Sequence, residues 1–554
     1  MTAPKRLHAG PSRAAPLLAA CSAVALLFSA TGCGTDGPSG GPGEPDPDRF
    51  VVEATISGLH DALRSGELTC RNVIDAYRRR IRAYDDSTRL NAITVLNPAA
   101  PDRADSLDRV RERGGDTGPL HCVATLVKDN MDTGDMVTTG GSVALEGSVP
   151  PDDATIVRRM REAGAVVVAK TNMAEWAFSP RQTVSSSFDT TRNAYALDRV
   201  PAGSSGGTAS GVAASFALVG LGTDTGNSIR GPSSHLALFG IRSTLGLVSR
   251  DGIIPLYFDR DVAGPMTRTV ADAARVLEVI AGRDTADPYS RLLEGREPGG
   301  YPGHVDAGGL EGARVGVLRD LAVPSESDSS VLRLFDRAVA DMREAGAEIV
   351  DPFTIPGLAR HLEADLTCPR FRYDANRYLE SLGADAPLRD VATVLETGEY
   401  APYAEGALES LTGRPGDVHP SRWNPPCPDF WNHEGRQAFR EDVVAAMDSA
   451  GVDVVVYPSW THPPAHVDSA RAGYRGDNSQ LVSPDTGLPA ATVPMGFSYG
   501  RHPAGLQILG RPFDEAAIFR VARGYERATR HRRPPEGFPP LDGNRRNRRG
   551  GETK

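Results

Sequence analysis

The chain has 554 residues, which is long enough for one large α/β domain or for two to three domains of ordinary size. Hydrophobic residues make up 40% of it and charged residues 24%, a balance typical of globular proteins. The formal net charge of −10 gives no reason to expect nucleic acid or an acidic membrane surface as a binding partner.

The first 32 residues are predicted to be a signal peptide and not part of the fold. A positively charged start precedes an apolar run, residues 14–30, that is too short to span a membrane as a mature helix. The run ends in SATGC, and small residues before a cysteine are typical of a bacterial lipoprotein cleavage site, with Cys33 as the acylated first residue. We expect export and a lipid anchor on the extracytoplasmic side of the cell membrane. An ordinary signal peptide cut near this point, giving a secreted protein, is the alternative.

Composition divides the remaining chain into three parts. Residues 33–50 are rich in Gly, Pro and Asp, cannot bury a core, and are predicted to form a tether. We place the folded domain at residues 51–535. Residues 536–554 contain four arginines close together and are predicted to be a basic, disordered tail.

The cysteines argue against a metal site. No two cysteines are separated by two residues, so a zinc or thioredoxin-type site has no support. Cys368 and Cys427 both lie beside prolines in one region and can pair in an oxidising compartment, but the sequence leaves that bridge open.

The first half of the domain alternates between helical and strand patterns. Helical periodicity extends over residues 53–85, and residues 91–96 form a short strand candidate. An apolar run follows at residues 123–127. An amphipathic helix is predicted over residues 154–163, and a buried strand over residues 166–169. This alternation is typical of α/β folds.

The second half contains one segment that departs from this pattern. Residues 203–222 are dense in small residues, which lets another backbone approach closely, so we expect this segment at the centre of the fold. Residues 310–355 indicate strand, helix and strand. Residues 356–436 lose periodicity and gain Pro, Trp and Tyr, and are predicted to be a mostly helical excursion that shapes a pocket mouth. A strand at 454–457 and a helix at 514–529 complete the domain.

Three local features carry chemistry: GSSGG at residues 203–207, GTDTGNSIR at residues 222–230, and Lys128 at the end of an apolar run. The residues of the Gly-Asn-Ser turn within the second motif tolerate positive φ, so successive backbone N–H groups can turn toward one point and bind an oxyanion. A lysine held in apolar surroundings loses its proton more readily and can act as a base.

The first motif also satisfies the G-x-S-x-G pattern of a nucleophile elbow, with Ser205 as its central serine. An elbow requires an apolar strand directly before it. Residues 193–201 are polar and end in proline, so that strand is missing and we do not favour this interpretation.

Together these segments resemble the amidase signature family, whose mark is a Gly-Gly-Ser-Ser-Gly-Gly run followed by Gly-Thr-Asp-Thr-Gly-Gly-Ser-Ile-Arg. The spacing between Lys128, Ser204 and Ser228 agrees with that family as well. Further matching segments extend the resemblance over most of the mature chain: GPL at 118–120, VKDN at 127–130, KTNMAE at 170–175, GPMTRTV at 264–270, TGLPA at 486–490 and GLQ at 505–507.

The resemblance implies a catalytic triad. Ser228 would be the nucleophile, and Ser204 would sit on a cis peptide bond and bridge Ser228 to Lys128. Neutral Lys128 would take the proton of Ser228 through Ser204 and later return it to the leaving amine.

The resemblance also implies a supporting set around the triad. Backbone N–H groups would form an oxyanion hole, and two side chains would hold the loops by hydrogen bonds. The oxyanion-hole residues are Thr225, Gly226, Asn227 and Ser228, and the two supporting residues are Ser205 and Asp224.

Four positions depart from the family pattern. Asn227 and Ala202 stand where glycine is usual, and Cys122 and Ala124 replace a common glycine and proline before the lysine. Asn is the non-glycine residue that best accepts positive φ, so we expect the loop around Asn227 to survive the change.

The fold that the resemblance implies is α/β, one large domain with a mixed central sheet covered by helices on both faces. The implied reaction is hydrolysis of a carboxamide to a carboxylate and ammonia or an amine through an acyl-enzyme, with no metal and no cofactor. Residues 247–255 resemble members that act on peptide C-terminal amides, so we favour peptide or small-molecule amides as substrates.

Two alternatives stay open. One is the amidase component of an aminoacyl-tRNA amidotransferase, against which the export signal argues. The other is a non-catalytic, surface-binding lipoprotein that keeps the fold. Neither the natural amide nor the oligomeric state follows from the sequence.

Overall fold

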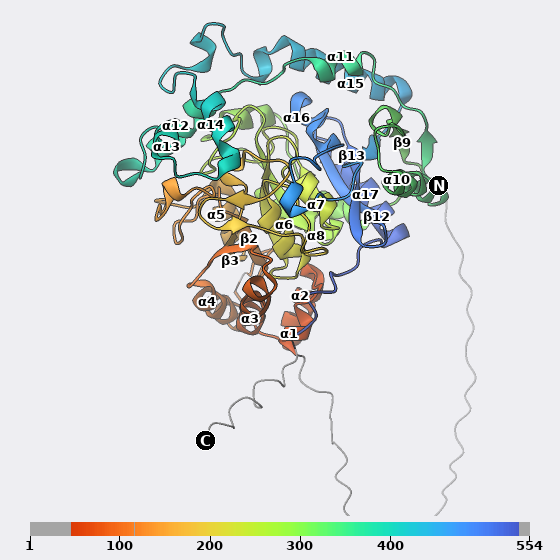
Figure 1. The fold of residues 1–554 in the computed structure, drawn as a ribbon. Coiled ribbons are helices and arrows are strands. Elements are labelled where there is room, and N and C mark those ends of the chain that lie inside the picture. Colours follow the sequence, from red (N-terminus) through yellow and green to blue (C-terminus); the bar gives the residue numbers. More distant parts are fainter. Residues whose placement is uncertain (1–45, 116, 542–554) are drawn as a thin grey trace, which may run out of the picture. The chain divides into compact units, whose positions relative to one another are not determined.

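The computed structural model describes residues 46–115 and 117–541, and within them one mixed sheet of 11 strands organises the fold (Figure 1). Its order is β1-β3-β2-β6-β8-β7-β12-β13-β11-β9-β10. The strands are β1 (Ile93–Leu96), β2 (Ala124–Lys128), β3 (Val166–Thr171), β6 (Val219–Asp224), β7 (Phe239–Arg242), β8 (Val262–Thr267), β9 (Arg314–Val317), β10 (Glu348–Val350), β11 (Val454–Pro458), β12 (Ala490–Ser498) and β13 (His502–Leu509), and the short strands β4 (Val184–Ser185) and β5 (Asp189–Thr190) pair separately.

Parallel and antiparallel pairs both occur in this sheet. Strand β2 runs parallel to β3 and β6, and β9 runs parallel to β10 and β11, whereas the other neighbours are antiparallel. Every residue of β2, β3, β6 and β8 is buried. Successive side chains point to opposite faces, so complete burial means that both faces are covered there. The expected α/β fold, a mixed sheet covered by helices, is confirmed.

Helices surround the sheet; α12, α13 and α14 lie together at the upper left of the view, and α11 lies beside α15 at its upper edge (Figure 1). The helices are α1 (Pro47–Phe50), α2 (Ile56–Ser65), α3 (Cys70–Thr88), α4 (Ala100–Glu112), α5 (Thr155–Glu162), α6 (Gly206–Ala213), α7 (Arg230–His235), α8 (Val270–Ile280), α9 (Tyr301–Asp306), α10 (Ser329–Glu344), α11 (Leu358–Glu363), α12 (Phe371–Ser381), α13 (Thr393–Thr397), α14 (Glu405–Thr412), α15 (Glu434–Ala450), α16 (Ser483–Thr486) and α17 (Glu515–Thr529). None of the helices in the described ranges is long and apolar enough to cross a membrane.

The segment rich in small residues lies at the centre of the fold, as its composition predicts. Helix α6 packs against β2, β6 and β8. A Cβ on Gly207 would lie 2.2 Å from the carbonyl oxygen of Asn172, so only glycine permits this approach of the two backbones. The second part of the segment forms most of strand β6.

Ordered residues occur in both ranges that flank the predicted domain. Helix α1 lies inside the range predicted as a tether, and its Asp48 pairs with Arg79 of α3 at 3.0 Å. At the other end, Phe538 is buried inside the range predicted as a tail, and the buried Arg80 guanidinium donates to its carbonyl oxygen. The signal peptide, Cys33 and the four tail arginines lie outside the described residues, and the interpretations placed on them stay predictions.

Two disulfides connect distant segments of the described chain. Cys368 and Cys427, whose pairing the sequence left open, are joined with a Cα–Cα distance of 5.8 Å. Cys70 at the start of α3 and Cys122 before β2 are joined as well, with a Cα–Cα distance of 5.5 Å, and nothing in the sequence predicted this bridge.

We expect the double substitution of Cys70 and Cys122 by alanine to lower the free energy of unfolding by about 2–4 kcal/mol, since the bridge closes a long loop in the unfolded chain. Urea denaturation of the purified protein measures the change. An unchanged unfolding midpoint would show that the bridge does not contribute to stability under these conditions.

Candidate active site

Lys128 ends the buried strand β2, and its side chain is fully buried. Its Nζ atom lies 2.7 Å from Ser204 Oγ and 2.6 Å from Thr223 Oγ1. Strands β2 and β6 are parallel neighbours, so their carboxyl ends meet and bring Lys128 to Thr223. Burial lowers the pKa of Lys128 to about 7, although the carboxylates of Asp261 and Asp224 act in the opposite direction.

The serine pair lies at the start of α6. The peptide bond between Gly203 and Ser204 is cis, and Ser204 is fully buried beside Lys128. Ser205 makes no contact suited to a nucleophile, because its Oγ donates to the carbonyl oxygen of Thr223 at 3.1 Å. It therefore connects α6 to the end of β6.

Thr223 is a site residue that the sequence analysis did not single out. Its hydroxyl accepts hydrogen bonds from Lys128 Nζ and from Asn130 Nδ2, the latter at 3.1 Å. Because this hydroxyl acts as an acceptor in both hydrogen bonds, one N–H of Lys128 points toward it. The threonine stands inside a recognised motif, but nothing in the motif indicates this contact.

Ser228 is 5% exposed and lies in the loop between β6 and α7. Its Oγ donates to Asn227 Oδ1 at 3.5 Å, and no hydrogen bond joins it to Ser204 among the described residues. The structure thus joins Ser204 to Lys128 by a hydrogen bond, but within the described residues no hydrogen bond joins Ser228 to either of them.

The side chain of Asn227 ties this loop to distant segments. Its Nδ2 donates to Asp477 Oδ2 at 2.8 Å and to the carbonyl oxygen of Pro180 at 3.1 Å. Neither Asn227 nor Gly226 has a positive φ, so the asparagine at this position does not need to adopt the left-handed conformation. Ala202, which also replaces a usual glycine, does have a positive φ of 67°.

The loop presents a row of backbone donors. Thr225, Gly226, Asn227 and Ser228 all line one cavity. No acceptor is found within the described chain for the N–H groups of Gly226, Asn227 and Ser228. Three adjacent donors without partners form a site suited to an oxyanion.

Asp224 holds the loop through two buried arginines. Its carboxylate accepts from the backbone N–H of Ile229 at 3.1 Å, from Arg230 Nε at 3.1 Å and from Arg242 Nη1 at 3.3 Å. Burial alone would raise the pKa of Asp224, but the charges of Arg230 and Arg242 outweigh it and hold the pKa below its ordinary value. Asp224 is therefore an ionised anchor of the loop.

The cavity at this loop has a volume of about 260 Å³. Helix α14, from the excursion predicted to shape a pocket mouth, supplies part of its wall. The described lining residues are Ala177, Phe178, Pro180, Thr225, Gly226, Asn227, Ser228, Leu256, Tyr257, Arg260, Ala407, Ser410, Leu411 and Gln480.

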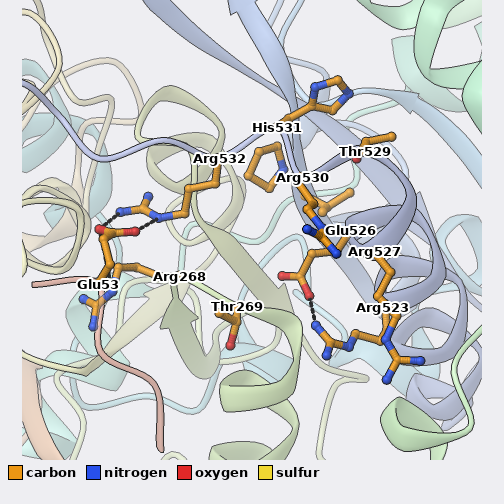
Figure 2. A pocket seen from close by; sticks show the side chains of 12 residues that line it. Glu53, Arg268, Thr269, Arg523, Glu526, Arg527, Thr529, Arg530, His531 and Arg532 are labelled. Carbon is orange, nitrogen blue, oxygen red and sulfur yellow. Dashed lines mark hydrogen bonds and ion pairs between the residues drawn. The ribbon is translucent and has the colours of Figure 1, made fainter. Parts of the chain in front are cut away.

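A larger cavity of about 590 Å³ lies elsewhere, between the first residues of the domain, the start of α8 and the end of α17. Figure 2 shows its charged lining, with Glu53 paired to Arg532 and Glu526 paired to Arg523. It contains no residue of the serine–lysine cluster, so we assign the active site to the smaller cavity on chemical grounds. No group of His, Cys, Asp or Glu side chains suited to a metal ion is found in the described part of the chain.

A family described as amidase matches residues 72–519. A glutamyl-tRNA(Gln) amidotransferase subunit from Synechococcus sp. (strain CC9902) is 34% identical over 488 residues, covering 86% of this chain and 96% of that protein.

Solved structures are similar as well. Native peptide amidase from Stenotrophomonas maltophilia is 35% identical with a TM-score of 0.76, covering 88% of this chain and 99% of that chain. An amidase family protein from Bacillus anthracis str. Ames is 26% identical with a TM-score of 0.77, covering 88% of this chain and 93% of that chain.

We expect Asp224→Asn to lower the free energy of unfolding by about 3–5 kcal/mol, because it leaves two buried arginines without their charge partner. Urea denaturation of the variant and the parent protein measures this. Glu294→Gln is the control, because Glu294 pairs with Arg283 in an exposed ion pair and its loss should change stability little. Equal effects of the two substitutions would contradict the anchoring role of Asp224.

Proposed function

The chain belongs to the amidase family of amide-hydrolysing enzymes, and from this membership we propose that it is a serine amidase with Ser228 as nucleophile and Ser204 and Lys128 as its proton relay. The observation that carries the proposal is the contact of 2.7 Å between Lys128 Nζ and Ser204 Oγ in a place without water access. A lysine with a pKa of about 7 is neutral in a large fraction of molecules near neutral pH and can accept a proton.

The hydrogen bonds around Lys128 favour this direction of proton transfer. A neutral amine has two N–H donors and one lone pair. One N–H is directed to the doubly accepting hydroxyl of Thr223, which leaves the lone pair available to accept the hydroxyl proton of Ser204.

In the proposed reaction, Ser228 Oγ attacks the amide carbon, and its proton passes to Ser204 while the proton of Ser204 passes to Lys128. The contact of Ser228 with Asn227 is at the long limit of a hydrogen bond, so the hydroxyl can turn to Ser204 when substrate binds. The C–N bond then breaks as the relay returns a proton to the leaving nitrogen. Water attacks the acyl-enzyme by the same relay and releases the carboxylate.

The unpartnered N–H groups of Gly226, Asn227 and Ser228 support an oxyanion hole for the tetrahedral intermediate. Such donors are fixed before the reaction and need no reorganisation when charge develops on the carbonyl oxygen. Each is typically worth about 10²–10³ in rate.

For the substrate, we propose a primary carboxamide at the end of a peptide or of a small molecule, with ammonia as leaving group. The similarity to a protein named peptide amidase supports this class, and so does a cavity of about 260 Å³ that can hold an acyl group beside the loop. The two disulfides favour a place of action outside the cytoplasm, where a role in aminoacyl-tRNA amidotransfer is not expected.

We expect Ser228→Ala to abolish ammonia release while the protein keeps its fold. The assay uses aliphatic amides, aryl amides, peptide amides and glutamine, with thermal unfolding of the same samples as the measure of folding. Ser106→Ala, on the surface of α4, is the control and should keep full activity. Turnover retained by Ser228→Ala would contradict the assignment of the nucleophile.

We expect kcat/KM to rise as the pH increases through about 7 and to level off under mildly alkaline conditions. kcat/KM rises with pH because only the deprotonated form of Lys128 can accept a proton, and this form prevails above the pKa of the lysine. A pH series with the preferred amide measures the profile. Lys128→Met should remove activity at every pH, and a variant that kept the rising limb would show that another group is the base.

A further inference from the structure

We propose that the substrate of the proposed amidase carries a carboxylate on its acyl part and that Arg260 binds it. This inference deepens the proposed function and rests on it. The guanidinium of Arg260 has N–H groups that donate no hydrogen bond within the described residues.

Buried arginines in this chain are otherwise well partnered. Eight arginines are buried in the described ranges, and for seven of them the side chain donates hydrogen bonds to carboxylates or carbonyl oxygens. Arg260 is the exception: Arg242 and Arg268 also leave their Nε without a partner but donate through their other nitrogens, whereas the Arg260 side chain donates no hydrogen bond within the described residues. A buried donor without an acceptor is costly unless another molecule supplies the acceptor.

The surroundings of Arg260 leave it open to a ligand. Its neighbours in sequence are engaged elsewhere: Asp259 accepts from Arg436 at 2.7 Å, and Asp261 accepts from the backbone N–H of Leu256 at 2.8 Å. Within the described part of the chain, Arg260 forms one ion pair: Asp485 Oδ1 lies 3.3 Å from Nη2, in a geometry that makes no hydrogen bond. This contact leaves most of the N–H groups of the guanidinium free.

Arg260 lies where the free N–H groups of its guanidinium can bind a ligand. Arg260 lines the same cavity as Ser228 and the row of free backbone N–H groups. Among the described residues of that lining it is the one with a full charge at neutral pH, and several of the others are apolar. Apolar walls strengthen the attraction between charges, and the planar guanidinium fits the two oxygens of a carboxylate.

The proposal therefore assigns two ends to the substrate. The carboxamide lies against Ser228 and the backbone donors, and a second, anionic carboxyl group reaches Arg260. Monoamides of dicarboxylic acids and peptide amides with an acidic side chain near the amide have this chemistry.

The test is a binding measurement that does not depend on turnover. Monoamides of straight-chain dicarboxylic acids with four to eight carbons, and the methyl esters of the same compounds, are titrated calorimetrically into the Ser228→Ala protein. We expect at least one free acid to bind about 10- to 100-fold more tightly than its ester, as a charge-assisted hydrogen bond to arginine implies. In Ser228→Ala/Arg260→Gln, acid and ester should bind equally weakly.

Two further variants distinguish binding of the carboxylate by Arg260 from a general effect of charge on ligand binding. Asp485→Asn removes the carboxylate that competes for Arg260, so affinity for the free acid should increase while affinity for the ester stays the same. Arg530→Gln removes an exposed charge in the larger cavity of Figure 2 and should change neither the affinity for the free acid nor the affinity for the ester.

Equal binding of acids and esters by the protein with Arg260 would overturn the proposal, and so would a preference for acids that survives Arg260→Gln. In either case, ammonia release that depends on Ser228 would leave the proposed function in place. Loss of all hydrolysis, with the preference for acids intact, would instead count against the proposed function alone.

Discussion

A lysine amino group without access to water is the constraint on which the rest of this site depends. Strand β2 is buried on both faces, and among the described residues the Nζ of Lys128 at its end hydrogen-bonds to two hydroxyl groups and to no carboxylate. A free carboxylate nearby would stabilise the charged amine and remove its capacity to act as a base. The two acids that raise its pKa are held by other partners, Asp224 by Arg230 and Arg242, and Asp261 by Thr225 and a backbone N–H.

The sequence predicts what local pattern and motif spacing determine. It indicates the strand before Lys128, the amphipathic helix α5, the α/β class and the segments that meet at the site. It does not indicate that residues 53–85 form two helices, separated where Gly66 adopts a φ of 77°. Nor does it reveal contacts that depend on tertiary packing. Asn227 and Asp477 are 250 residues apart, and no local signal relates them.

The two cavities show why size does not identify the site. The larger one contains several charges, but its carboxylates are already neutralised by neighbouring arginines (Figure 2). The smaller one combines free backbone donors, a serine hydroxyl and a guanidinium without hydrogen-bond acceptors. Unsatisfied hydrogen-bonding groups that face one space distinguish a binding site from a solvent-filled gap.

The disulfide between Cys368 and Cys427 has a consequence for how the enzyme can diversify. Residues 369–426 leave and rejoin the domain at two points whose Cα atoms are 5.8 Å apart. This closed segment includes α14 and its part of the cavity wall, whereas the serines, the lysine and the arginine anchors all lie outside it. Replacing this segment with its counterpart from another amidase can therefore change the cavity wall without altering the residues of the proposed proton relay.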